Sequence, residues 1–246
     1  MSVIVMLHRV LNACGLRVED GRLVTRRRIE ALGRRIFGKI DRAEYDRLVN
    51  SYWLPGEIRK ARENERLFVE MALRLRLDRP PELKILDIGG KAGTFAFVCR
   101  CLGHEAWTTD LEPMLGRSPN PELFRLFDVP VFPLKISPFE QLPYTGRRYN
   151  LITGFRTRFH SRYTWETGLE HEIHWGPGEW DFLLRDLARN HLAPGGRIFF
   201  KLNRLQDREK NDDFPKPMRD YFASVGGELD GNLLLFRTVD RLREPP

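Results

Sequence analysis

The sequence is poor in cysteine and has no long hydrophobic run, and both shortages narrow its class. Its 246 residues include only three cysteines, Cys14, Cys99 and Cys101, an odd number without the C-x-x-C spacing of a metal site. The longest apolar runs, Val3–Leu7 and Phe95–Cys99, are far shorter than the roughly 20 residues that span a bilayer. No basic segment precedes the first run in the manner of a secretory signal. We therefore expect reduced thiols and a cytoplasmic protein without a transmembrane segment.

Positive charge is in excess at one end of the chain. The chain carries 41 Lys and Arg against 34 Asp and Glu, a net charge of +7. Residues 1–80 hold 18 basic and 11 acidic residues, and residues 81–246 are balanced at 23 of each. Such a basic region fits contact with nucleic acid, anionic lipid or an acidic substrate. It also fits an arginine-rich solvated helix face, which is the more common case.

The hydrophobic pattern changes at a pair of prolines. From Glu57 to Leu77, apolar residues recur at helical spacing, which predicts an amphipathic helix. Pro80-Pro81 end this helix because proline has no N–H to donate. We expect residues 1–80 to form a basic helical extension and residues 81–246 to form a second domain. There, short apolar strands alternate with helices, which predicts a doubly wound, mostly parallel α/β sheet.

The second part of the chain allows individual elements to be bounded. Strands are expected at Lys84–Ile88, Ala106–Thr109, Val131–Ile136, Tyr149–Phe155 and Arg197–Leu202, and helices at Thr94–Leu102 and Glu179–Leu192. Glu228–Thr238 has the pattern of an antiparallel hairpin with a tight turn at Asp230-Gly231-Asn232. Residues 156–177 have no periodicity and are rich in Arg, His, Tyr and Trp. A loop of that length is uncommon unless it is functional.

A glycine-rich turn follows the first expected strand. Asp87 lies near the end of the strand, and the chain then turns through Gly89, Gly90 and Gly93 into a helix. The free N–H groups and the positive dipole end of a helix N-terminus favour a ligand there. Asp110 ends the next strand about 20 residues later, the spacing at which an acid meets ribose hydroxyls. These features predict an adenosine-containing cofactor.

Several other patterns are missing from the sequence. The turn has neither the G-x-G-x-x-G of a dinucleotide site nor the G-x-x-x-x-G-K-[ST] of a phosphate loop. No Ser-His-Asp, Cys-His or paired-carboxylate arrangement stands out. The cofactor therefore belongs to another adenosine-containing class.

The remaining motifs resemble the class I S-adenosylmethionine-dependent methyltransferase family. Its first motif is similar to Asp87-Ile-Gly89-Gly-Lys91-Ala-Gly93, and its second acid to Asp110. Its helix-to-strand turn is similar to Leu192-Ala-Pro-Gly-Gly-Arg-Ile-Phe-Phe200, and Gln141-Leu-Pro143 and Tyr149–Thr153 match its third and fourth strands more loosely. The resemblance covers roughly residues 82–240.

The resemblance implies a seven-stranded Rossmann-like sheet with one reversed strand and S-adenosyl-L-methionine as cofactor. The cofactor-binding residues that it implies are Asp87, Gly89, Gly90, Gly93, Asp110, Leu111 and Glu140. Two positions depart from the family pattern. Lys91 replaces the usual middle glycine, and the third strand ends in Lys135-Ile-Ser-Pro138, where many relatives carry an Asp for the adenine amino group. A backbone contact or Glu140 would have to serve instead.

Sulfonium methyl transfer needs mainly alignment and the removal of a proton. The nucleophile and the methyl carbon must meet within about 3–3.5 Å, and no covalent residue is required. His160, His171 and His174, in the loop after the fourth strand, are candidate general bases, although a surface or hydrogen-bonded structural role is the more common one for any single histidine. His171 and His174 also have the spacing of two metal ligands on a helix, but no third ligand is evident and we expect no metal.

Aromatic residues in two regions have two interpretations each. Tyr163 and Trp165 either stack on a planar or sugar substrate or pack their loop onto the sheet. Tyr45, Tyr52 and Trp53 either close a helical lid over the cofactor or anchor the N-terminal helices.

The sequence thus predicts a methyltransferase that acts on a small molecule or on a glycan or lipid intermediate. One alternative is an RNA methyltransferase whose basic N-terminal region grips phosphates. Gly-Phe-Arg-Thr follows Thr153, so the Asn/Asp-Pro-Pro-aromatic motif of amino-directed nucleic-acid enzymes is absent, and no Pro-Cys nucleophile of cytosine-C5 enzymes was found. The other alternative is a non-catalytic binding protein that keeps the fold.

Overall fold

The computed structural model describes residues 17–19, 22–53, 55–155, 157, 161–162, 173–202 and 214–244. Its contacts divide the chain into two compact units. One, here called the helical unit, joins Met1–Glu82, Ala92–Glu105 and Gly116–Val129. The other, the sheet unit, joins Leu83–Lys91, Ala106–Leu115 and Pro130–Pro246. The chain first leaves the helical unit after residue 82, and two later segments return to it.

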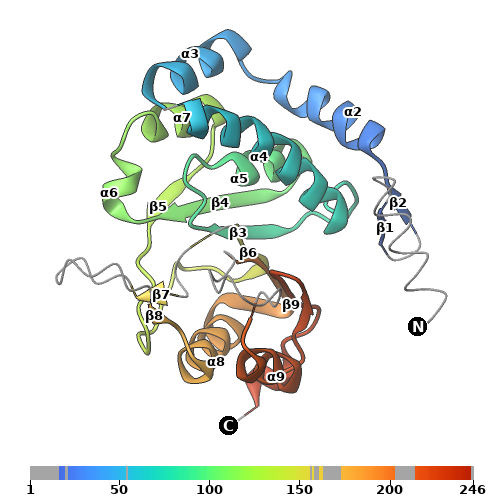
Figure 1. Cartoon of the computed structure of the whole chain (residues 1–246), viewed down its shortest axis with the longest axis vertical. Coiled ribbons are helices and arrows are strands. Elements are labelled where there is room, and N and C mark those ends of the chain that lie inside the picture. Colours follow the sequence, from blue (N-terminus) through green and yellow to red (C-terminus); the bar gives the residue numbers. More distant parts are fainter. Residues whose placement is uncertain are drawn as a thin grey trace. The chain divides into compact units, whose positions relative to one another are not determined.

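The helical unit contains five helices and a short ribbon among its described residues. The ribbon pairs β1 (Arg17–Glu19) with β2 (Arg22–Val24), and the helices are α2 (Arg26–Phe37), α3 (Arg42–Tyr52), α4 (Pro55–Arg74), α5 (Thr94–Cys101) and α7 (Asn120–Phe127). Helix α4 contacts α2, α3 and α5, and α3 contacts α7 (Figure 1). The helices expected at 57–77 and 94–102 are confirmed as α4 and α5.

Side-chain caps explain where the first two helices begin. Thr25 accepts a hydrogen bond from Arg28 N at 3.2 Å, and Asp41 accepts one from Glu44 N at 3.0 Å. Each cap satisfies an N–H that has no partner inside its helix. Helix α2 then buries one apolar face made of Ile29, Leu32, Ile36 and Phe37.

The sheet unit is built on a seven-stranded sheet. Its strands are β3 (Lys84–Ile88), β4 (Glu105–Asp110), β5 (Val131–Pro133), β6 (Tyr149–Phe155), β9 (Leu192–Lys201), β10 (Glu228–Asp230) and β11 (Leu233–Phe236). They lie in the order β10-β11-β9-β6-β3-β4-β5, and Figure 1 labels the five strands from β9 to β5. The pairs β3–β6, β6–β9 and β4–β5 are parallel, and β11 runs antiparallel to both β9 and β10. The expected mostly parallel seven-stranded sheet with a terminal hairpin is confirmed.

Some boundaries differ from the sequence prediction. Strand β5 stops at Pro133, three residues early, where its partner strand β4 ends at Asp110. Helix α8 (Pro177–Asp186) passes into a π-helical turn η1 (Leu187–His191), and β9 begins at once at Leu192. Leu192 pairs with Tyr149 and the next pair is Arg197 with Leu151, so Gly195 and Gly196 lie in an irregularity of β9 that leaves the ladder.

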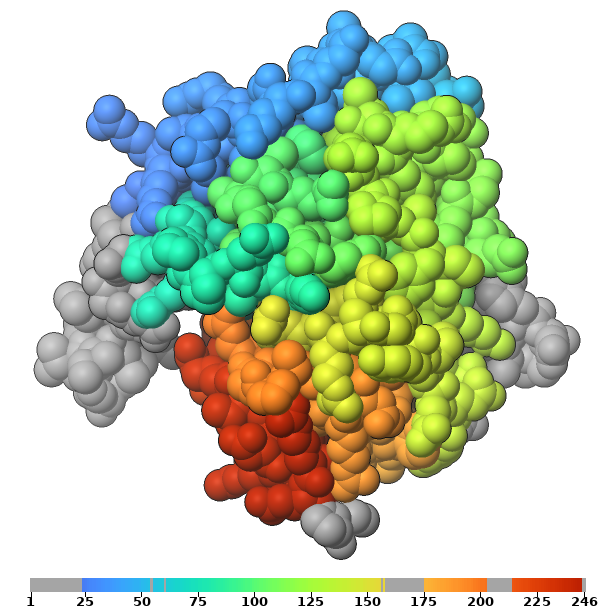
Figure 2. Space-filling model, turned by 180° about the vertical axis from the view of Figure 1, so that it is seen from behind, coloured from blue at the N-terminus to red at the C-terminus, as the bar shows by residue number. Residues whose placement is uncertain are grey.

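Helices α8 and α9 (Lys216–Ser224) pack in the core of the sheet unit. Trp180 of α8 is 1% exposed, and its ring meets that of Phe222 on α9 edge-on, with centroids 5.3 Å apart. Trp180 also contacts Phe200 of β9. Figure 2 shows the red C-terminal residues beside the orange residues of this part of the chain.

Three shorter elements complete the described chain. They are α6 (Glu112–Leu115), α10 (Asp240–Arg243) and an antiparallel ribbon of β7 (Ser161–Arg162) with β8 (Ile173–His174). The ribbon lies within the segment that the sequence predicted to be a long loop. Among the described helices, none has the length and apolarity to cross a bilayer.

Candidate cofactor site

A buried carboxylate lies at the centre of the candidate site. Asp87 of β3 is 1% exposed, and its Oδ1 accepts a 2.8 Å hydrogen bond from Thr153 Oγ1 of the neighbouring strand β6. Burial raises the pKa of Asp87 to about 7; the charge of Asp110 acts in the same direction and the Thr153 hydrogen bond opposes both. Asp87 therefore changes charge near neutral pH.

The turn after β3 requires glycine at two positions for steric reasons. A Cβ on Gly90 would lie 2.0 Å from Thr108 Oγ1 and 2.6 Å from Asp87 Oδ2. A Cβ on Gly89 would lie 2.6 Å from Cγ2 of Thr157, whose hydroxyl donates to Ile88 O at 3.0 Å. The turn thus brings its backbone closer to the strand ends than any side chain would permit.

The backbone of the turn alternates into the left-handed region. Gly89, Lys91 and Gly93 have φ values of +68°, +50° and +73°. For glycine this conformation costs little, but for lysine it is unfavourable by roughly 1–2 kcal/mol. Lys91, which stands where the family that the sequence resembles usually has glycine, therefore lies at a position whose backbone geometry favours glycine.

Asp110 ties the end of β4 to the glycine turn. Its Oδ2 accepts from Lys91 N at 2.9 Å, and its Oδ1 accepts from Leu111 N at 2.8 Å. Burial raises the pKa of Asp110, while the two N–H groups and the charge of Lys91 lower it. Gly90 N also donates to Thr109 O at 2.9 Å, so the turn is fastened to β4 at two places.

This arrangement suits the ribose of an adenosine cofactor. An ionised carboxylate has about four acceptor positions, and two of those on Asp110 are used by backbone N–H groups. The remaining positions can accept from vicinal hydroxyls. The next side chain, Leu111, is 47% exposed and offers an apolar contact to a flat base.

The other predicted cofactor residues are placed less decisively. Gly93 is the N-cap of α5, in the helical unit, and carries no side-chain cap. Glu140 is exposed in the turn after β5, where its N–H contacts Ser137 O at 3.4 Å. Its contact with adenine stays a prediction.

The predicted lid residues lie in the helical unit. Tyr45 of α3 is 2% exposed, and its ring packs on Phe127 of α7 with centroids 5.7 Å apart. The guanidinium of Arg42 lies over the same ring at 4.9 Å. These contacts are those of an anchor between helices. Tyr52 is 52% exposed at the end of α3, and Trp53 is its C-cap. The lid role stays a prediction.

The substrate-side predictions fall mostly outside the described residues. His160, His171, Tyr163 and Trp165 are in that category. The backbone of His174 is described and pairs with Ser161 in the β7–β8 ribbon. Among the residues that the structure describes, no three potential ligands gather into a metal site.

Sequence reasoning missed three threonines of the site. Thr108 Oγ1 contacts Asp87 O at 3.3 Å, and Thr153 and Thr157 hold the end of β3 as described above. Thr108 lies on β4, whereas Thr153 and Thr157 lie on and just after β6, so only the sheet order brings both segments to β3. The sequence could have indicated them only through their position at or near the carboxyl ends of the two strands beside β3, the edge where α/β sheets bind ligands.

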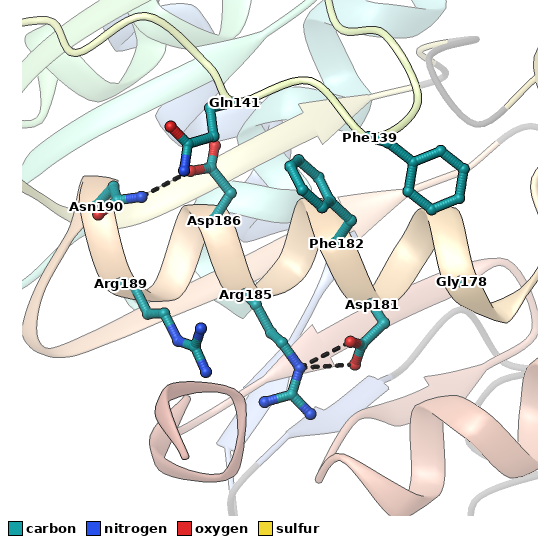
Figure 3. Close-up of a pocket in the computed structure, with 9 residues that line it drawn as sticks. All are labelled: Phe139, Gln141, Gly178, Asp181, Phe182, Arg185, Asp186, Arg189 and Asn190. Atoms are coloured by element: carbon teal, nitrogen blue, oxygen red, sulfur yellow. Dashed lines mark hydrogen bonds and ion pairs between the residues drawn. The ribbon is translucent and has the colours of Figure 1, made fainter. Parts of the chain in front are cut away.

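A groove on the sheet unit lies along α8 and η1. Its volume is about 370 Å³, and Figure 3 shows Phe139 and Phe182 facing one another at its apolar end. At its other end Asp186 accepts from Asn190 Nδ2 at 2.7 Å and from Leu142 N at 2.9 Å. None of the glycine-turn residues, nor Asp110, lines this groove.

The chain is similar in structure to several methyltransferases. The glycopeptide N-methyltransferase MtfA is 17% identical over 59% of this chain and 56% of that chain, with a TM-score of 0.40. MtfA has also been solved with sinefungin and with S-adenosyl-L-homocysteine. An O-methyltransferase family protein from Burkholderia thailandensis is 13% identical over 94% of this chain and 81% of that chain, with a TM-score of 0.44.

A third similar structure is DesVI from Streptomyces venezuelae. It is 14% identical over 68% of this chain and 88% of that chain, with a TM-score of 0.43. This chain spans little more than half the length of MtfA. No protein-family model and no curated protein matches the chain. With TM-scores below 0.5, the functional assignment rests on the geometry around Asp87 and Asp110.

Proposed function

We propose that this chain is an S-adenosyl-L-methionine-dependent methyltransferase that methylates a small molecule or a glycan or lipid biosynthetic intermediate. The observation that carries the proposal is the fastening of the glycine turn to Asp110 at the carboxyl ends of β3 and β4. Ligands of open α/β sheets bind at this edge. Neither a dinucleotide nor a phosphate-loop motif accompanies it.

Each residue of the site has a distinct part in holding the cofactor. Asp110 accepts from the ribose hydroxyls, Leu111 contacts the base, and Gly89 and Gly90 let the cofactor approach the backbone. The Asp87 carboxylate lies close to the turn at Gly90 and adds negative charge near it when ionised. A cationic cofactor is therefore bound better than a neutral analogue above pH 7, where Asp87 is deprotonated.

The reaction asks little covalent chemistry of the protein. When bound, the cofactor supplies a methyl group that its sulfonium already activates. The chain's residues align the acceptor with that carbon and exclude water, and a base takes the acceptor's proton where there is one. His160, His171 and His174 are the proposed bases, because their segment follows β6 at the ligand-binding edge of the sheet.

Calorimetry of the whole chain with S-adenosylhomocysteine tests the cofactor assignment. Wild-type protein should bind it and gain thermal stability, and NAD and ATP should give no comparable shift. Replacing Asp110 by Ala removes hydrogen bonds to a charged acceptor, which should weaken binding roughly 10- to 100-fold. The matched control is Asp220→Ala on α9, which removes an exposed carboxylate. Equal affinity in Asp110→Ala and wild type would contradict the assignment.

A turnover assay then separates catalysis from binding alone. Formation of S-adenosylhomocysteine from S-adenosylmethionine should depend on an added small-molecule, glycan or lipid acceptor. Cofactor binding without turnover on any acceptor would instead support a non-catalytic binding protein. Turnover that requires RNA would support the RNA methyltransferase alternative. Unchanged rates in alanine variants of all three histidines would remove them as bases.

A further inference from the structure

The positive charge of the N-terminal third is concentrated on one helix. Residues 26–39, which form α2 and its C-terminal end, contain six Lys and Arg against one Glu. The next segment, residues 40–80, contains nine against eight. The charge that distinguishes this third of the chain is therefore local to α2.

Helical geometry directs part of this charge away from the helical unit. At 100° per residue, Arg27, Arg34 and Arg35 fall within about 100° of one another. They lie on the side of α2 opposite to the buried Ile29 and Ile36, and all three are exposed. We call these three residues the arginine stripe. Ala31 and Gly38 lie between them on the same side, so no bulky side chain separates the guanidinium groups.

The other arginines of α2 are already paired. Arg26 Nε contacts Glu30 Oε1 at 2.6 Å, and Arg28 forms an ion pair with Asp78. Within the part of the chain that the structure describes, no side-chain hydrogen bond or ion pair engages Arg27, Arg34 or Arg35. The single carboxylate of the helix, Glu30, pairs with Arg26 and acts on Arg34 only through its charge. The three arginines of the stripe therefore carry more positive charge than this one carboxylate can balance.

We propose that the arginine stripe docks the protein on an anionic lipid surface by electrostatic attraction. This inference goes beyond the proposed function and does not depend on methyl transfer. Guanidinium groups suit lipid phosphates because their planar fork matches phosphate oxygens. The negative surface potential of such a membrane attracts a cluster of basic residues that lies close to it.

The surroundings of the stripe favour a lipid surface over single-stranded nucleic acid. Proteins that grip single strands combine positive charge with aromatic platforms for the bases. Among the described residues of α2, Phe37 is the only aromatic side chain, and it is 7% exposed. The apolar face of α2 is likewise buried in its unit, so α2 does not insert into the bilayer as an amphipathic helix. Docking should be peripheral and reversible.

Co-sedimentation with vesicles tests this proposal on the full chain. Vesicles of phosphatidylcholine with phosphatidylglycerol should bind the wild type, and vesicles of phosphatidylcholine alone should not. The variant Arg27→Gln/Arg34→Gln/Arg35→Gln should partition roughly 100-fold less strongly, about fivefold per arginine. Raising salt from about 50 to about 500 mM should release the wild type, since exposed charges are then screened.

A matched variant separates the stripe from net charge. Arg117→Gln/Arg125→Gln/Arg241→Gln removes the same three charges from other exposed positions and should lose less than about fivefold. Equal loss in both variants, or no wild-type binding at low salt, would overturn the proposal. Stripe-dependent binding to RNA that outcompetes the vesicles would overturn lipid as the partner. Thermal melts confirm folding of both variants, and S-adenosylhomocysteine binding, read separately, reports on the proposed function.

Discussion

The backbone N–H of Lys91 donates a 2.9 Å hydrogen bond to Oδ2 of Asp110. The donor is a main-chain group, so the link between the glycine turn and β4 does not depend on the side chain at position 91. It depends on the left-handed conformation of that residue, at φ +50°. A lysine can therefore occupy this position, where the family that the sequence resembles usually has glycine, without losing this contact.

Replacing Lys91 by Gly should preserve cofactor binding and should not destabilise the protein. Lys91→Ala should be less stable than Lys91→Gly by about 1 kcal/mol, because only glycine adopts this conformation without steric cost. Lys91→Pro should lose the Asp110 contact altogether, since proline has no N–H and cannot adopt positive φ. Urea unfolding measures the order. An alanine variant as stable as the glycine variant would show that the backbone at 91 is unstrained.

Gly90→Ala should abolish S-adenosylhomocysteine binding and cost about 1–3 kcal/mol of stability. The new methyl group would meet Thr108 Oγ1 and Asp87 Oδ2 at 2.0 and 2.6 Å. Adding Thr108→Ala removes the nearer atom and should restore part of the stability. Thermal unfolding and calorimetry read both effects.

Gly116→Ala is the matched control for that series. Its Cβ would meet nothing within 4 Å, so stability and binding should be unchanged. Failure of the second substitution to restore any stability would mean that the clash with Thr108 is not the cause.

Asp87→Asn should stabilise the protein more at pH 8 than at pH 5. The pKa of Asp87 is raised from 3.8 to about 7, so between these values the folded chain binds a proton that the unfolded chain has lost. Stability therefore falls as pH rises through that window. Asparagine removes this effect, which is on the order of a few kcal/mol at pH 8. Melting temperatures at the two pH values check it, with Asp220→Asn as the exposed control. A gain of the same size at both pH values would contradict it.

Asp186→Ala should destabilise the sheet unit by about 2–4 kcal/mol, because the buried Leu142 N–H would lose its acceptor. Asp186→Asn keeps an acceptor oxygen and should cost less. Burial acts to raise the pKa of Asp186, but its hydrogen bonds and the His191 imidazole, 3.5 Å away, outweigh burial and lower it. The carboxylate's contribution should thus persist above pH 4 and disappear in stronger acid. Urea titrations at neutral and acidic pH measure these differences. An Asp186→Asn variant as unstable as Asp186→Ala would contradict this account.

The sequence predicted the sheet well because its strands are local signals. The expected bounds of β3 and β6 match the structure, and the hairpin at Asp230-Gly231-Asn232 forms as its turn residues require. The glycine turn and Asp110 were also predicted, because residue type and spacing in the sequence are enough to identify them.

The parts that could not be predicted depend on contacts between distant segments. Thr153 lies 66 positions from Asp87 in the chain, and nothing in its own neighbourhood marks it as a partner. The π-helical turn after α8 likewise interrupts a segment whose periodicity reads as one helix. In the helical unit, His104 Nε2 contacts Leu77 O at 2.7 Å across 27 positions. Such pairings are set by tertiary packing and leave no periodic trace.

The two compact units are threaded through one another along the chain. The polypeptide passes between them after residues 82, 91, 105, 115 and 129, so neither unit is a continuous fragment. A fragment that ended at residue 82 would contain α4 without α5, its partner within the helical unit. Neither unit can therefore be produced as one continuous fragment, and we expect that unfolding of either unit would unfold the whole protein.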